Sequence, residues 1–89
     1  MAVSSGSVTV GAAAVALNSE SGATAGTRLY VSNTGANDAT LGDASVTGST
    51  GFVLEAGASL ALELSYGEVV YAVRTDSDDT TLQVMRTGA

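Results

Sequence analysis

The side chains of this chain that could take part in chemistry are few, and the usual catalytic types are missing. The sequence contains no His, Cys or Lys. These are the residues whose pKa values proteins most readily bring near neutrality for acid/base and nucleophilic catalysis. Carboxylates and hydroxyls remain, but the sequence shows no base that would activate a hydroxyl. We therefore expect no enzymatic activity and no cofactor.

A group of acids in one polar turn is the strongest candidate for a metal site. Asp76, Asp78 and Asp79 follow one another closely, and hard cations such as Ca²⁺ take several oxygen ligands from a single loop. The Gly and the distal bidentate Glu of an EF-hand loop are missing, and Asp also favours turns for conformational reasons. We expect a solvated turn without metal, which Asp38 and Asp43 would join only if the fold brought their loops together.

Two residues of one expected strand are candidates for contact with a partner. In the segment 27–33, Arg28 and Tyr30 fall on the same face, opposite Leu29 and Val31. Arg and Tyr are enriched among the residues that dominate binding energy at protein interfaces. The alternative is a solvated Arg whose stem lies over the Tyr ring. Arg74 and Arg86 present the same choice, since each could pair with a neighbouring acid.

The overall charge limits the classes of partner. Nine acids and three arginines give a net charge of −6, and nucleic-acid affinity depends largely on Lys and Arg that displace counterions. We therefore expect neither nucleic acid nor an anionic membrane as a partner. No stretch approaches the ~18 apolar residues of a membrane-spanning helix, and no secretory signal is recognisable. We expect a protein that is made in the cytosol and stays soluble.

Alternation of apolar and polar residues predicts the elements that position these side chains. In 59–66, leucines alternate with polar or small residues, and the pattern resumes after Gly67 in 69–74. We predict that these two strands form a hairpin turning at Tyr66–Gly67, and that 80–87 adds the third strand of a meander. The strand faces predict the following buried residues: Leu29, Val31, Phe52, Leu54, Leu60, Leu62, Leu64, Val69, Tyr71, Val73, Leu82 and Val84.

The whole pattern predicts an all-β protein. Further short strands are expected near 27–33, 39–41 and 52–54 and in the N-terminal segment, with turn residues about every ten positions. The run 12–17 is rich in Ala but too short for a stable helix, and we interpret it as a strand. We predict a flexible arm at 1–6 and a single small antiparallel β-sandwich or barrel of seven to eight strands at 7–89.

The C-terminal two-thirds of the chain resembles a known class of proteins. The segments GFVLEAGASLALEL, VVYAVRT and TTLQVMRTG, between Arg28 and Gly88, are similar to small β-rich structural proteins encoded near the capsid genes of tailed bacteriophages. The resemblance implies a capsid decoration or head-fibre protein, and we expect a decoration protein, made in the host cytoplasm, that binds the major capsid protein on the virion exterior and stabilises the shell. It also favours a homo-oligomer, with a trimer preferred. A carbohydrate-binding or adhesion module of a phage fibre or tail is the alternative.

Overall fold

The chain folds into β-strands joined by turns. The computed structural model describes residues 3–18, 22–23 and 26–87, and the described residues contain no helix. The strands are β1 (Ser4–Val10), β2 (Val15–Ala16), β3 (Thr27–Asn33), β4 (Ala39–Gly42), β5 (Phe52–Leu54), β6 (Ser59–Leu64), β7 (Tyr71–Arg74) and β8 (Thr80–Thr87).

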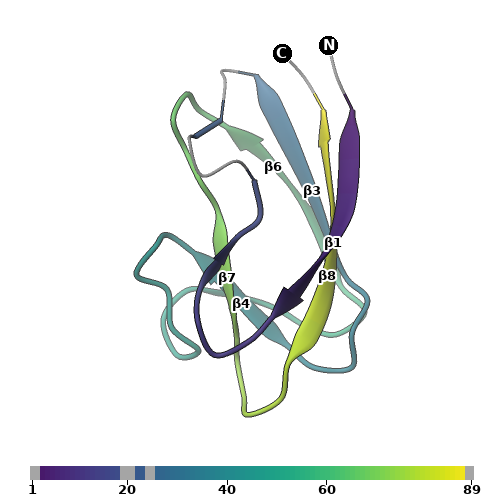
Figure 1. The fold of residues 1–89 in the computed structure, drawn as a ribbon, viewed down its shortest axis with the longest axis vertical. Coiled ribbons are helices and arrows are strands. Elements are labelled where there is room, and N and C mark those ends of the chain that lie inside the picture. Colours follow the sequence, from purple (N-terminus) through teal and green to yellow (C-terminus); the bar gives the residue numbers. More distant parts are fainter. Residues whose placement is uncertain (1–2, 19–21, 24–25, 88–89) are drawn as a thin grey trace.

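These strands form two antiparallel sheets that pack as a sandwich (Figure 1). One sheet has the order β1-β8-β3-β6 and the other β2-β7-β4-β5. Along the chain, successive strands alternate between the sheets, except that β4 and β5 are neighbours in one sheet. This strand order is that of an eight-stranded jelly roll, which contains two Greek keys. The predicted small all-β sandwich is confirmed.

The core lies between the two sheets. It is built from the side chains of each strand that point toward the other sheet. Leu29, Val31 and Leu82 from one sheet, and Leu41 and Ala72 from the other, belong to one buried cluster. Leu29, Leu82 and Ala72 are fully buried. Because these side chains are aliphatic and small, the space between the sheets is filled without an aromatic centre.

The predicted hairpin at Tyr66–Gly67 is wrong. β6 pairs with β3, whereas β7 pairs with β2 and β4 in the other sheet. The connection after Leu64 therefore crosses between the two sheets, which in sandwiches lie about 10 Å apart. β8 likewise leaves β7 and pairs with β1 and β3, so the C-terminal meander does not form. Alternation identifies which side chains share a face, but it contains no information about which strand lies alongside.

The predicted inward face of β7 is also reversed. Ala72 is the β7 residue in register with Leu41, and both belong to the core, so Tyr71 and Val73 point outward. Val73 is nevertheless buried, as predicted, because the connection 43–51 folds over the outer face of this sheet. There Val46 is also buried, and Thr40 Oγ1 hydrogen-bonds the carbonyl oxygen of Gly48 at 3.3 Å.

Two predicted core residues are exposed. The exposed fractions are 64% for Phe52 and 37% for Leu62. Both side chains share the inward faces of their strands, since Phe52 is in register with Leu41 and Leu62 with Leu29. However, β5 and β6 are the edge strands on the same side of the sandwich, and no further strand covers them among the described residues. Of the other predicted core residues, Leu60, Val69, Tyr71 and Val84 are half-buried and the rest are buried.

At the N-terminus, the sheet begins earlier than the expected boundary. β1 starts at Ser4, which is in register with Arg86 of β8, so residues 4–6 of the expected arm are part of a strand. Backbone groups make this ladder, so small polar side chains do not prevent it. Met1 and Ala2 lie outside the described residues. In the run 12–17, only Val15–Ala16 forms a strand.

Candidate docking surface

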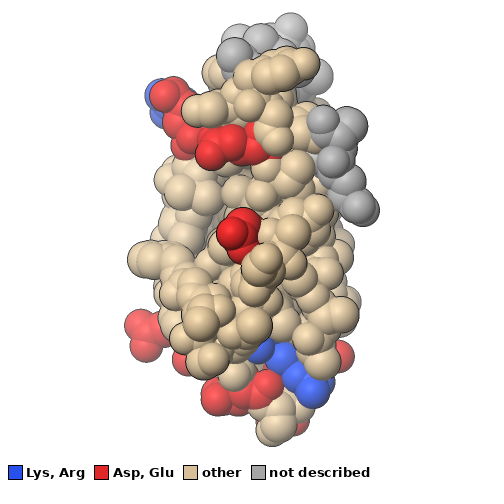
Figure 2. Space-filling view, turned by 90° about the vertical axis from the view of Figure 1, so that its left-hand side faces the viewer, with Lys and Arg blue, Asp and Glu red and all other residues tan. Residues whose placement is uncertain are grey.

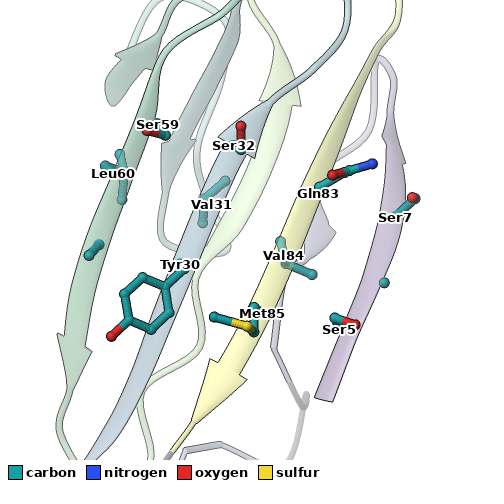
Figure 3. Close-up of a pocket in the computed structure, with 12 residues that line it drawn as sticks. Ser5, Ser7, Tyr30, Val31, Ser32, Ser59, Leu60, Gln83, Val84 and Met85 are labelled. Carbon is teal, nitrogen blue, oxygen red and sulfur yellow. The ribbon is translucent and has the colours of Figure 1, made fainter. Parts of the chain in front are cut away.

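The outer face of the sheet β1-β8-β3-β6 is the surface on which the predicted contact residues lie. Alternation sends every second side chain of these strands away from the core. The register then aligns them across the sheet in rows. One row consists of Ser5, Met85, Tyr30 and Ala61, and the next of Ser7, Gln83, Ser32 and Ser59. Figure 3 shows the labelled members of both rows on the same side of the sheet.

Tyr30 and Met85 are the large side chains at the centre of this surface (Figure 3). Met85 is 38% exposed and Tyr30 is half-buried. Most of the outward side chains around them are short, with Gln83 the longer exception, and the surface is hollowed there. None of the described residues that line this hollow is charged. Such a surface offers apolar contact and hydrogen-bonding hydroxyls to a partner.

Arg28 lies on the same outer face as Tyr30, as the alternation predicts, but its charge is already partnered. Its register neighbour is Glu63 of β6, and the guanidinium lies 3.6 Å from the Glu63 carboxylate. Both side chains are mostly exposed, at 60% and 70%. An exposed ion pair of this kind contributes only about 0–1 kcal/mol to stability. Arg28 therefore remains available to a partner at the rim of the surface.

Met85 was not among the contact residues predicted from the sequence. Alternation does place it on the polar face of its strand, beside Gln83. Its position next to Tyr30 depends on the pairing of β8 with β3. Because these two strands are far apart in the sequence, no local pattern signals that they are neighbours.

The acidic residues considered for a metal site are distributed among separate contacts. The Asp79 carboxylate lies 2.8 Å from the Arg74 guanidinium, so of the two alternatives for Arg74 the structure shows the pairing with a neighbouring acid. Asp38 accepts a hydrogen bond from the backbone N–H of Ala56, and Asp43 from that of Ser45, two residues along. Within the described ranges, no three acids come together as a group that could hold a metal ion.

The opposite side of the molecule carries most of its visible charge at its ends. In the view of Figure 2, acidic and basic side chains gather toward the two ends of the sandwich, and the surface between them is mainly uncharged. The described residues include no helix that is long and apolar enough to span a membrane.

Comparison with known proteins gives no relative: no family model, no curated protein and no solved structure matches this chain.

Proposed function

We propose that this protein is a structural component of a tailed-phage virion, which decorates the outer surface of the capsid shell by binding the major capsid protein. The observation that carries the proposal is the hollow on the outer face of the sheet β1-β8-β3-β6, which is lined by uncharged residues and has Tyr30 and Met85 at its centre. Aromatic residues, Met and Arg are enriched in the cores of protein interfaces, whereas Glu, Asp and Lys are depleted. Arg28 lies at the rim of the same face.

The proposed mechanism is linkage between binding and shell assembly. A protein that binds the assembled shell but not its separated subunits stabilises the shell by mass action. In a small cyclic oligomer, with a trimer preferred, each docked copy holds the others at high effective concentration, so weak individual contacts suffice. The net charge of −6 suits the outside of a DNA-filled shell better than a position against the genome.

Two observations bear on the alternative function, a carbohydrate-binding or adhesion module: the fold and the positions of the aromatic residues. Jelly rolls occur both in viral capsid proteins and in lectins, so the fold alone favours neither. Carbohydrate binding by stacking would be favoured by a flat row of exposed aromatics. Instead, Tyr30 lies on one outer face, Tyr71 on the other, and Tyr66 in the connection after β6. We therefore favour protein docking over sugar binding.

The proposal is tested by co-sedimentation of the purified protein with expanded capsid shells of the phage that encodes it. We expect wild-type protein to pellet with the shells and Tyr30→Ser to bind about ten-fold more weakly. Tyr66→Ser is the matched control, because Tyr66 is 82% exposed and lies outside this face. Circular dichroism establishes that both variants are folded.

The opposite results would reject the proposal. Failure of the wild-type protein to pellet with shells would exclude decoration, and so would images of virions that place the protein only in the tail. Equal binding by wild type and Tyr30→Ser would exclude this face as the contact.

A further inference from the structure

The open side of the sandwich contains an apolar slot between the edge strands β5 and β6. We define the edge slot by six apolar residues that line it: Leu41, Phe52, Leu60, Leu62, Leu64 and Val70. These residues come from both sheets and from the segment that crosses between them. The slot therefore continues the hydrophobic core to the surface, at the side of the sandwich that no described strand closes.

Phe52 is the most unusual member of the edge slot. It is the only Phe of the chain, and it points along the core face of β5 while remaining 64% exposed. Leu62 across the slot is 37% exposed. An aromatic ring exposed in an apolar concavity is typical of a site that another chain fills, since contiguous exposed apolar surface is costly in an isolated protein.

The backbone beside the slot is equally suited to a partner. β6 is six residues long, and among the described strands it pairs with β3 alone. An edge strand presents a row of backbone N–H and C=O groups that point away from the sheet. Proteins usually protect such an edge with Lys, Pro or a bulge. The chain contains neither Pro nor Lys, and the charged residue of β6, Glu63, is directed to Arg28.

The charges at the slot determine what kind of chain fits. Asp43 and Glu68 both line it. One oxygen of each carboxylate accepts a backbone hydrogen bond, from Ser45 and Ser65 respectively, which leaves the other oxygen for a cation. Two of the three arginines of this chain are already paired with its own acids. At the slot, Asp43 and Glu68 would repel an acidic segment and attract a basic one.

We infer that the edge slot receives an extended segment of a partner protein, which adds to the sheet as a strand alongside β6. Its backbone completes the edge hydrogen bonds, as in other cases of β-strand addition. Its alternate side chains are apolar and enter the slot against Phe52 and Leu62. At least one Lys or Arg of the segment lies against Asp43 and Glu68. The slot borders the proposed capsid contact along β6, where Leu60 and Ala61 line both, whereas Phe52 and Leu62 line the slot alone. The inference holds whatever the identity of the partner.

A designed peptide tests the inference without any capsid. The probe is about eight residues long, with capped ends, valine alternating with threonine and a lysine at each terminus. Fluorescence anisotropy of the labelled peptide measures its affinity for the full chain, and amide hydrogen exchange locates the contact. We expect binding that protects the amides of β6, and about ten-fold weaker binding to Phe52→Ser and to Leu62→Thr. Val53→Thr is the control, because Val53 neighbours Phe52 in β5 and is 44% exposed but lies on the opposite face of the strand, outside the slot.

Two control peptides separate the contribution of side-chain alternation from that of charge. A peptide of the same composition with its valines adjacent should bind more weakly, because only strict alternation directs all apolar side chains into the slot. A peptide with glutamate in place of lysine should also bind more weakly, with the difference reduced at high salt. Equal affinity for all three peptides would overturn the inference.

The remaining outcomes also overturn it. They are failure of the alternating peptide to bind, unchanged affinity in Phe52→Ser and Leu62→Thr, or protection confined to strands other than β6. A dimer in sedimentation experiments that dissociates in Phe52→Ser would show that a second copy fills the slot instead. Since capsid co-sedimentation uses Tyr30→Ser, failure of either proposal leaves the other intact.

Discussion

The hydroxyl of Thr80 donates a hydrogen bond to the side-chain oxygen of Asn33 at 3.0 Å, although the two residues are 47 positions apart. The same Asn33 oxygen accepts the backbone N–H of Gly35, and its amide nitrogen donates to the carbonyl oxygens of Asn37 and Leu54. Asn33 is 1% exposed. One buried side chain therefore joins the end of β3 to β5, to β8 and to the turn before β4.

Removing this side chain should be among the most damaging polar substitutions in the protein. We expect Asn33→Ala to lower the free energy of unfolding by about 2–4 kcal/mol, because several buried polar groups lose their partner. Thr80→Val should cost about 1 kcal/mol, since Asn33 keeps its other bonds. Urea denaturation followed by circular dichroism measures both. A loss for Asn33→Ala no larger than that for the exposed Thr34→Ala would contradict this prediction.

Two glycines form a matched test of the packing of the 43–51 connection. A Cβ at Gly48 would lie 2.7 Å from the backbone oxygen of Thr75, whereas a Cβ at Gly6 would meet nothing within 4 Å. We expect Gly48→Ala to destabilise the protein by about 1–3 kcal/mol. Gly6→Ala should leave stability unchanged or raise it by up to about 1 kcal/mol, because Ala loses less entropy than Gly in a strand. Equal melting temperatures for the two variants would contradict the close packing of Gly48 against the backbone of Thr75.

Two leucines should distinguish the closed core from its open side. Leu29 is fully buried and is in register with Leu62, which is 37% exposed. We expect Leu29→Ala to cost about 2–5 kcal/mol and Leu62→Ala about 1 kcal/mol. The comparison is made by urea denaturation of the isolated protein. A larger loss for Leu62→Ala than for Leu29→Ala would contradict the exposure of Leu62 at the edge slot.

Reversing the charge of Arg28 should affect docking more than folding. Arg28→Glu removes an exposed ion pair and sets two carboxylates opposite each other, which costs about 1 kcal/mol or less. We expect a folded protein with reduced occupancy on capsid shells. Combining it with Glu63→Arg restores an ion pair within the sheet. If the double variant recovers full occupancy, the loss came from the sheet and Arg28 does not contact the shell.

Chelation should leave the protein unchanged. Asp79 is paired with Arg74, and the neighbouring acids Asp76 and Asp78 are exposed, so the turn offers a weak site for Ca²⁺. We expect excess chelator to change neither the melting temperature nor shell binding. Binding of an ion to the native state alone would raise the melting temperature with ion concentration. A rise of many degrees on adding Ca²⁺ would therefore contradict this prediction.

The local pattern of the sequence predicts where the strands lie well, but it predicts poorly which strands pair with each other. Alternation locates β3, β6 and β8 and places Arg28 and Tyr30 on one face. It cannot distinguish a hairpin at Gly67 from a crossing between sheets, because a tight turn suits both. The prediction reversed the inward and outward faces of β7 because both faces are covered. The core covers one face, and Val46 with the connection 43–51 covers the other.

The candidate site was only partly predictable for the same reason. The pairing of Tyr30 with Met85 is a property of strand register between distant segments. The exposure of Phe52 follows from its position on an edge strand, and apolar character alone does not show whether a strand is central or at an edge.

The pairing of the first strand with the last has a consequence for how the chain reaches this structure. β1 pairs with β8 along its whole length, and β8 also lies between β1 and β3. During synthesis, the sheet thus stays incomplete until β8 has left the ribosome. Until then, the backbone groups of β1 and β3 that pair with β8 have no strand partner. Topologies dominated by such distant pairings fold slowly, on the millisecond to second scale. The nascent protein is therefore exposed to aggregation for longer than a hairpin protein of the same length.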